Sequence, residues 1–342
     1  MIALRQGLFI ILGAATAATT LGGWTHPARA EGAQASGVPA PVQYFPPGAV
    51  WTQDVSAAPV DPQSATIIDS LSQAGGWGTG SMRVDSSIRV MQANASTPTV
   101  PFTPSPGFYT PDSDLVSSVP LPADGGMEGQ SGYQCDPSQQ DCHFIVVNND
   151  QGKLYEAWGA NYDGNAVSAT ILAVWDLTRV YPASGRGDQC SSADAAGFPI
   201  APLLFTANEL AQGHIDHAIR FILPNDRIRA GVFVHPATHA GSPQGSASDP
   251  PYGVQLRLKA SYDLSQLKPA ARVVAAAMQK YGMFLADGGS IALTAQSDQD
   301  TQTKYSDLDF GPSDLSSLKV TDFEVVQLGP PIPLTYDCVR NQ

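Results

Sequence analysis

Residues 213–242 read GHIDHAIRFILPNDRIRAGVFVHPATHAGS, which is two apolar runs separated by a turn. The runs at 214–223 and 228–235 are rich in Ile, Val and Phe, so the pattern predicts a β-hairpin. Four of the six histidines of the chain lie in this stretch. Because imidazole has the side-chain pKa nearest neutrality, the hairpin is also the first place to look for chemistry.

Further strands are expected before and after this hairpin. Residues 143–148 and 154–159 are short apolar runs joined by turn residues, which predicts a second hairpin. Residues 94–113 contain five prolines, and proline lacks the donor that a sheet ladder needs, so an extended surface connection is expected there rather than a central strand. Strands are also predicted at 168–177, 254–264 and 290–295.

Helices are predicted at few places. Residues 269–281 begin with proline and carry apolar side chains at helical spacing, which predicts one α-helix. Thr206 and Glu209 form a capping box for a short helix that ends at Gly213. Together the elements indicate a mainly β protein, a β-sandwich or jelly-roll-like domain with one packed α-helix (269–281) and short helical turns.

The first 30 residues have the organisation of a secretory signal peptide. Arg5 precedes an apolar run, and Ala28-Arg29-Ala30 has the form of a cleavage site. The alternative is a membrane anchor, which is disfavoured because the run has about 15 residues and a spanning helix needs about 20. We therefore expect a secreted or periplasmic protein with no membrane span after cleavage of 1–30, an irregular lead-in at 31–50 and a single β-rich domain at 51–342.

The chain is acidic. Its net charge of −13 becomes −15 if Arg5 and Arg29 leave with the signal peptide. Nucleic acids and anionic lipids need basic surfaces, so both are disfavoured as partners. The sequence contains no G-x-S-x-G, P-loop, H-E-x-x-H or G-x-G-x-x-G motif. We expect a monomer without a cofactor.

Four cysteines in an exported chain indicate disulfides. Cys135 and Cys142 enclose a short polar loop, which leaves Cys190 to pair with Cys338 near the C-terminus. The bridges 135–142 and 190–338 are one of three possible connectivities. A C-x6-C spacing is not a zinc motif, and His143 beside Cys142 does not complete one.

Strand alternation sorts the side chains of 214–222 into two faces. His217 falls in an apolar row, either as a hydrogen-bonded core residue or as a general acid or base. Arg220 falls on the opposite face, either in a solvated ion pair or in contact with substrate. His239 lies in a loop, where functional residues are common, and metal ligation together with Asp287 is a weaker alternative.

The predicted strand at 254–262 has a polar face that carries Arg257 and Lys259. This face is either an ordinary solvent-exposed surface or one that binds acidic or hydroxyl-rich sugar, because guanidinium and ammonium groups both bind carboxylates.

Three carboxylates are further candidates. Glu156 lies in a predicted strand near Trp158, a setting that suits sugar stacking as well as core packing. Asp194 either caps a helical turn or acts in catalysis, and Asp287 is either a turn residue or faces a cleft. A glycosidase needs two such groups at a set separation, which sequence does not measure.

The chain contains the blocks SADAAGFPI at 192–200, HAIRF at 217–221, HPATH at 235–239, RLKASYDL at 257–264 and YGMFLADGGS at 281–290. These blocks resemble those of a family of exported bacterial and fungal proteins of unassigned function. In that family the pattern reads ADAAGLPI, HA[IL]RF, WPARH, RLKASFDI and YGMILADNGS. This chain departs from it at His235, Thr238 and Gly288, so a shared activity would not imply a shared substrate. The resemblance implies one continuous exported domain and supplies no reaction.

These observations predict an exported carbohydrate-active protein that degrades polysaccharide or oligosaccharide. In a polysaccharide lyase, Arg257 and Lys259 would neutralise a uronate, His217 or His239 would remove a proton, and Tyr281 would return it.

In a glycoside hydrolase, two of Glu156, Asp194 and Asp287 would be the acid and the base or nucleophile, while Arg220 and Trp158 would bind substrate. The alternative is a non-catalytic glycan-binding or cell-envelope structural protein. A single site that uses His217, His239, Arg257 and Asp287 requires these four side chains to meet in one cleft.

Overall fold

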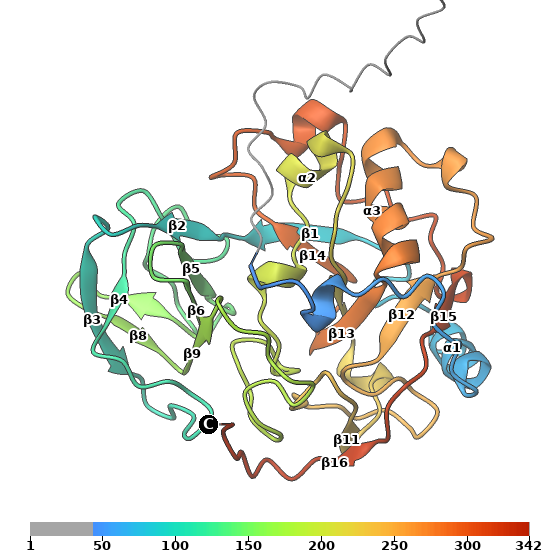
Figure 1. The fold of residues 1–342 in the computed structure, drawn as a ribbon, viewed down its shortest axis with the longest axis horizontal. Helices are drawn as coiled ribbons and strands as arrows, with labels where there is room; N and C mark the ends of the chain where they lie inside the picture. Colours follow the sequence, from blue (N-terminus) through green and yellow to red (C-terminus); the bar gives the residue numbers. More distant parts are fainter. Residues whose placement is uncertain (1–43, 342) are drawn as a thin grey trace, which may run out of the picture. The chain divides into compact units, whose positions relative to one another are not determined.

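The computed structural model describes residues 44–341. The predicted signal peptide (1–30) and most of the predicted lead-in (31–50) lie outside the described residues. The strands form four open sheets (Figure 1). With 24% strand and 16% helix the protein is mainly β, which confirms the expected class.

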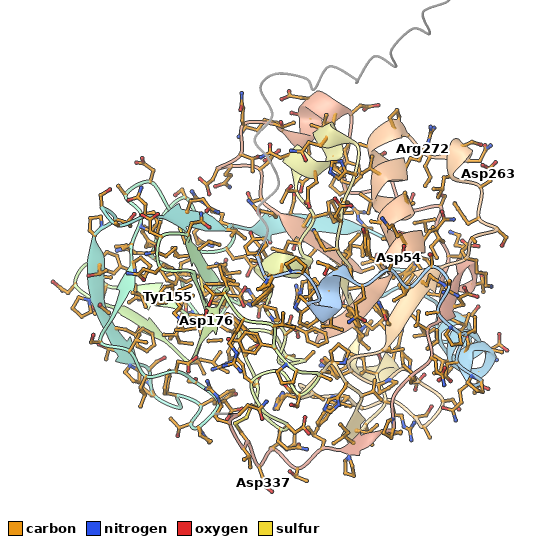
Figure 2. All side chains as sticks on the ribbon, viewed as in Figure 1. Asp54, Tyr155, Asp176, Asp263, Arg272 and Asp337 are labelled. Carbon is orange, nitrogen blue, oxygen red and sulfur yellow. A yellow bond between two sulfur atoms is a disulfide. The ribbon has the colours of Figure 1, made fainter. Side chains whose placement is uncertain are left out.

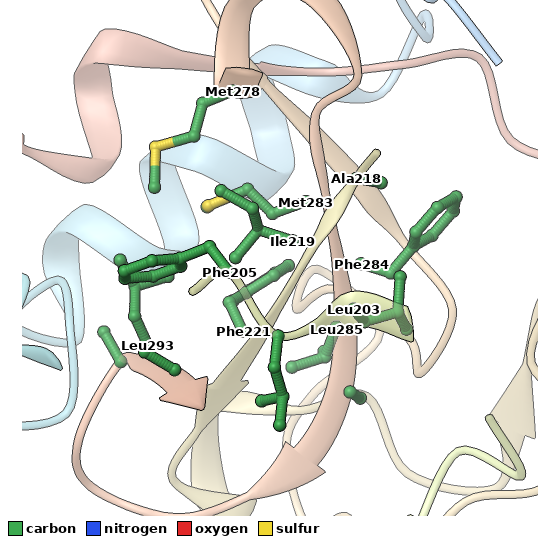
Figure 3. Close-up of a cluster of buried hydrophobic side chains, with 14 of the residues drawn as sticks. Leu203, Phe205, Ala218, Ile219, Phe221, Met278, Met283, Phe284, Leu285 and Leu293 are labelled. Atoms are coloured by element: carbon green, nitrogen blue, oxygen red, sulfur yellow. The ribbon is translucent and has the colours of Figure 1, made fainter. Parts of the chain in front are cut away.

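The largest sheet has six strands in the order β1-β14-β10-β13-β12-β15. Strands β10 (Ile219–Leu223) and β13 (Met283–Gly288) run parallel at its centre. Figure 3 shows their side chains in an apolar cluster in which Phe221 and Leu285 are fully buried. The remaining strands are β1 (Val84–Ile88), β14 (Leu293–Gln296), β12 (Gln255–Leu258) and β15 (Phe323–Val325).

Two helices pack against the last two strands of this sheet, β12 and β15. Helix α3 (Pro269–Lys280) contacts β12 with a buried row that includes Val274, and α1 (Ser64–Gln73) contacts β15 (Figure 1). Helix α2 (Ala207–Gln212) has the predicted capping box and ends at a left-handed Gly213. The short 3-10 helices are η1 (Val50–Thr52), η2 (Ala201–Leu203), η3 (Asn225–Arg227), η4 (Leu264–Gln266), η5 (Tyr305–Leu308) and η6 (Val320–Asp322).

Two four-stranded sheets follow β1 in the chain. The first, in the order β2-β5-β6-β9, contains the predicted hairpin, with Asn148 opposite Lys153. Its strands are β2 (Met91–Ala93), β5 (Phe144–Asn148), β6 (Lys153–Trp158) and β9 (Ile171–Asp176). The second, in the order β4-β3-β8-β7, consists of β3 (Thr99–Pro104), β4 (Ser118–Pro120), β7 (Asn161–Tyr162) and β8 (Val167–Ala169).

Strand β5 is buried on both faces because two apolar cores meet there. Phe144 and Val146 belong to a smaller core with β3 and β8, whereas Ile145 and Val147 belong to the main core. A strand that is covered on both sides reads as a continuous apolar run, which is the pattern at 144–147. The sheet of β5 and β6 therefore joins the two cores rather than facing solvent.

The predicted hairpin of 214–223 and 228–235 is wrong. Strand β10 pairs with β13 and β14, whereas β11 (Val232–Phe233) pairs with β16 (Ile332–Pro333) in a separate two-stranded sheet. The partner of β10 lies about sixty residues later, and a local apolar pattern contains no information about so distant a partner.

The proline-rich segment also differs from expectation, because β3 lies between β4 and β8. Residues Thr99–Pro101 pair with β4 and residues Phe102–Pro104 with β8, and the amide of Phe102 also donates to the Ser117 carbonyl beside β4 at 3.1 Å. The two partner strands overlap only at Phe102, so the prolines of β3 leave fewer donors unmatched than they would in a fully paired central strand.

Both predicted disulfides are present, Cys135–Cys142 and Cys190–Cys338. They are consistent with an oxidising compartment outside the cytoplasm. Within residues 44–341, no helix combines the length and the apolar character that crossing a membrane requires.

Candidate functional site

A cavity of about 740 Å³ lies where the loops beside β6 and β9 approach the carboxyl end of β13. Its volume falls within the range of roughly 300–1,000 Å³ typical of small-molecule sites. The ionisable side chains of its lining are Asp112, Asp141, His239 and Asp287. The aromatic side chains are Phe108, Tyr109, Trp158, Tyr252 and Tyr336.

Asp287 reaches the cavity because it lies near the end of β13, opposite Ile222 of β10. Its side chain is 30% exposed, and its Oδ1 accepts a hydrogen bond from the Gly288 amide at 2.7 Å. Burial raises the pKa of Asp287, against the opposing effect of the nearby Arg220 guanidinium. The group therefore holds a proton to higher pH than an exposed aspartate.

Arg220 links Asp287 to a second, fully buried carboxylate. Its Nη2 donates to Asp194 Oδ1 and lies 3.5 Å from Asp287 Oδ2, while Nη1 donates to Thr294 Oγ1 at 2.8 Å. Burial raises the pKa of Asp194 to about 7, although Arg220 favours the ionised form. Asp194 Oδ2 is buried and makes no hydrogen bond to the described residues. The guanidinium of Arg220 is thus shared between the carboxyl groups of Asp194 and Asp287.

His239 has the opposite electrostatic character. Its Nδ1 lies 2.9 Å from the Ala195 carbonyl oxygen, so Nδ1 carries the proton and donates it there. Burial lowers the pKa of His239, which keeps the ring neutral. The lone pair then resides on Nε2, which has no hydrogen-bond partner among residues 44–341.

A short backbone bridge connects His239 to Asp287. The Ala196 amide donates to the Ala286 carbonyl at 2.8 Å, and the Ala196 carbonyl accepts from the amides of Thr238 and His239 at 2.9 and 3.3 Å. The ADAAG segment therefore fixes the loop of His239 to the end of β13. The backbone of Ala196 thus holds His239 and Asp287, which are far apart in sequence, at the same cavity.

The C-terminal tail forms part of the cavity wall. Tyr336 packs edge-on against the His239 ring, with ring centroids 5.3 Å apart, and its hydroxyl donates to the Gly241 carbonyl at 3.1 Å. The bridge from Cys190 to Cys338 holds the tail in this position. The predicted disulfide thus contributes to the shape of the cavity as well as to stability.

Asp141 and Trp158 form a pair on the side of the smaller sheets. Trp158 ends β6, and its Nε1 donates to Asp141 Oδ1 at 3.3 Å. Both residues line the cavity, and Asp141 is exposed to solvent. The sequence suggested Trp158 but gave no reason to select Asp141, which lies in the loop closed by the short disulfide.

His143 and Glu128 are a buried ion pair that the sequence did not reveal. His143 Nδ1 lies 2.6 Å from Glu128 Oε2, and Nε2 lies 3.2 Å from the Ala193 carbonyl, so both ring nitrogens face acceptors. Burial alone would lower the pKa of His143, but Glu128 outweighs it and raises the pKa to about 9. The resulting imidazolium supports the backbone beside Asp194.

His217 does not belong to this cavity. It precedes β10, with Nε2 3.1 Å from Glu209 Oε1 and Nδ1 2.8 Å from the Ala218 carbonyl. Glu209 also completes the capping box of α2. Tyr281 lies at the corresponding end of β13, and its hydroxyl donates to Asp216 at 3.3 Å. Both candidates lie at the amino ends of strands whose carboxyl ends approach the cavity.

Arg257 and Lys259 are also engaged elsewhere. Arg257 is 6% exposed, donates to Glu324 Oε1 at 2.6 and 2.9 Å and reaches the carbonyls of Val55 and Ala58. Arg257 is buried because β15 pairs outside β12 and places Glu324 opposite it. Lys259 donates to the Thr321 carbonyl at 2.7 Å. The expected cleft of His217, His239, Arg257 and Asp287 is therefore not formed.

Glu156 and Arg220 are inaccessible to a ligand. Glu156 is fully buried and accepts hydrogen bonds from Trp175 Nε1 and from the amides of Ile200 and Ala201, at 2.8 to 3.0 Å. Burial raises the pKa of Glu156 to about 7. Arg220 is 2% exposed, so it is a buried partner of carboxylates rather than a substrate-binding side chain on an open face.

Comparisons with protein-family models, curated proteins and solved structures found no match. Within residues 44–341, no cluster of three or more His, Cys, Asp or Glu side chains is arranged to hold a metal ion. The site is therefore interpreted from its own geometry.

Proposed function

We propose that this protein is an exported glycoside hydrolase that binds a polysaccharide or oligosaccharide segment in the cavity of Asp287 and His239. The observation that carries the proposal is that these two groups line one cavity and have pKa values shifted in opposite directions. Such a separation is how a site holds an acid and a base ready at the same pH.

In the proposed reaction, Asp287 donates its proton to the glycosidic oxygen while the bond to the anomeric carbon breaks. Water attacks that carbon, and Nε2 of His239 takes the proton that the water loses. His239 then releases this proton to solvent and Asp287 takes up a proton from solvent, which restores both groups for the next turnover. The second carboxyl group expected in a glycosidase is replaced here by a neutral imidazole, which performs the same proton transfer.

The aromatic lining supports a carbohydrate ligand. Sugar rings present C–H faces that pack on aromatic rings, and Trp158, Tyr109 and Tyr336 offer such surfaces around the cavity. Tyr109 and Tyr336 are 47% and 56% exposed, which leaves their rings available to a ligand.

Hydrolysis is favoured over a lyase reaction by what the cavity contains. A lyase must neutralise a uronate carboxylate, and the arginine and lysine expected to do so, Arg257 and Lys259, are paired elsewhere. Among the described residues that line the cavity none is an arginine or a lysine.

The proposal includes a secreted or periplasmic location, for which the predicted signal peptide at 1–30 and the two disulfides are the support. It also includes membership of the resembled family and a sandwich-like arrangement of the two smaller sheets around the Phe144 core. Several resembling blocks, including those of Asp194, His239 and Asp287, surround the cavity.

The test is release of new reducing ends from a panel of neutral, amino and acidic polysaccharides. Asp287→Asn and His239→Gln should each lower turnover by roughly 10²–10⁴-fold on the substrate that is cleaved. His217→Gln is the matched control, because it alters a histidine outside the cavity, and it should retain turnover.

Thermal unfolding of each variant separates loss of chemistry from loss of fold. Full activity in both cavity variants would refute the assigned roles. Tight glycan binding without any cleavage by the unmodified protein would favour the alternative, a non-catalytic glycan-binding protein.

A further inference from the structure

The charge around the cavity is unbalanced. Asp112, Asp141 and Asp287 line it, and no cationic side chain among the described residues does so. Asp112 is partly satisfied, because its Oδ1 accepts from the Ser191 amide at 2.7 Å. Asp141 receives only the indole N–H of Trp158 at 3.3 Å and is otherwise open to solvent.

The groups behind the cavity wall do not correct this imbalance. Arg220 is shared between Asp194 and Asp287, and His143 is paired with Glu128. Behind Asp112, Arg186 and Arg340 are both paired with Asp114. Asp194 and Asp287 hold their protons to higher pH than exposed aspartates, so the excess negative charge of the lining is at Asp141, which forms no ion pair with the described residues. In a partly desolvated cavity such an excess attracts cations and repels anions, because the surrounding dielectric screens the charges less than water does.

A buried hydroxyl in the cavity wall also lacks a well-aligned hydrogen bond, because its one neighbour is the Gly241 backbone. Tyr252 lines the cavity and is 0% exposed, and its hydroxyl makes no hydrogen bond of normal geometry, although it lies close to Gly241. A buried hydroxyl without a well-aligned partner is costly, so it indicates a position that a hydrogen-bonding ligand completes.

We propose that the cavity binds a protonated primary amine, and that its glycan is built from amino sugars with a free ammonium group. This inference rests on the proposed glycan function and names the substrate class. The ammonium lies beside the Asp141 carboxylate and the Trp158 indole, while Asp287 and His239 remain free for acid and base chemistry. An ammonium has three donors and a compact charge, which suit a carboxylate next to an aromatic ring.

The test is isothermal titration of the His239→Gln protein, in which turnover is suppressed, with a glucosamine hexasaccharide. The matched ligand is the N-acetylglucosamine hexasaccharide, which has the same backbone and no charge. We expect the free amine to bind about tenfold more tightly, and we expect this preference to fall as salt is added.

Two further substitutions locate the amine. Asp141→Asn should reduce the preference to within about threefold, because it removes the charge and keeps the shape. Asp263→Asn is the matched control, since Asp263 is an exposed aspartate beside Arg272 at the outer side of α3 (Figure 2) and leaves the cavity unchanged. It should retain the full preference.

The outcomes separate this inference from the proposed function. Equal affinity for the two hexasaccharides, or tighter binding of an oligogalacturonate, overturns the amine site even if neutral glycans are hydrolysed. A preference unchanged by Asp141→Asn overturns its location. A clear amine preference in a protein that cleaves no glycan supports the site and refutes the hydrolase.

Discussion

The two ends of strand β10 carry similar residue types in different environments. At its amino end His217 faces Glu209 and the Ala218 carbonyl, so both ring nitrogens are occupied. At its carboxyl end, on the neighbouring β13, Asp287 opens to a cavity that His239 also lines. A histidine that serves structure has its hydrogen bonds completed by the protein, whereas one available for chemistry retains a free lone pair.

The same contrast applies to charge. Glu209 serves a helix cap and an imidazole, and each of its oxygens has a partner. Asp194 and Asp287 share one guanidinium, and Asp194 Oδ2 has no hydrogen bond among the described residues. At the amino end of β10 the carboxylate and imidazole thus have all their hydrogen-bond partners, whereas at the carboxyl end one carboxylate oxygen has none within the described part of the chain. Incomplete pairing is the signature that distinguishes the candidate site from a structural cluster.

Replacing the shared cation should have the largest effect on stability. Arg220→Met leaves the buried Asp194 without its partner, and breaking a buried ion pair costs roughly 3–5 kcal/mol. Urea unfolding monitored by tryptophan fluorescence measures the change. The double variant Arg220→Met with Asp194→Leu should recover at least half of the loss, because the fully buried carboxyl group that lost its cation is removed as well. Wild-type stability in Arg220→Met would show that the network is not a structural requirement.

Removing the long disulfide should have the next largest effect. Cys190→Ser with Cys338→Ser opens a loop of 148 residues in sequence separation and should cost roughly 2–4 kcal/mol. It also frees Tyr336 from His239, so glycan affinity should fall even where the domain remains folded. Removing the bridge Cys135–Cys142 is the comparison for stability alone, because its loop is short and carries Asp141 of the cavity. Unchanged affinity without the long bridge would contradict the role of the tail as cavity wall.

The smallest effect on stability is expected from replacing His217, at the amino end of β10. Burial opposes protonation of His217, but Glu209 outweighs it and raises its pKa above 6.5 in the folded protein. A raised folded-state pKa stabilises the protein fully below the unfolded value near 6.5, and this stabilisation is lost as pH rises through the folded value. His217→Gln should therefore cost about 1–2 kcal/mol at pH 5.5 and less at pH 9. A cost that grows with pH would refute the ion pair.

Local sequence signals predicted the elements that depend on neighbours in the chain. Pro269 and the spacing of Val274 and Met278 predicted α3, and Thr206 with Glu209 predicted the cap of α2. The turn at 150–152 predicted the β5–β6 hairpin. An even cysteine count with one short loop predicted both disulfides. Each of these features is decided by groups a few residues apart, or by a pairing with few alternatives.

The candidate site was only partly predictable. His239 and Asp287 were selected from the sequence, but for a cleft that also contained His217 and Arg257. Alternation along an isolated strand does not show which face a later strand or loop will cover. Arg257 became buried because β15 added Glu324 beside it. The sequence around Asp141 predicted no function for this residue. Whether an aspartate in a loop binds a ligand depends on the side chains that the fold places around it.

The sequence by itself determined the mainly β class, helices α2 and α3, the short hairpin and the disulfide pairing, because propensity, capping and turn chemistry act over a few residues. The tertiary structure decided the parallel pairing of β10 with β13, and with it everything that depends on long-range neighbours. That pairing places Asp287 and His239 on one cavity and leaves His217 at the opposite end of the strand. Burial and partner charges then set which groups hold protons, and both are properties of the assembled fold rather than of any segment.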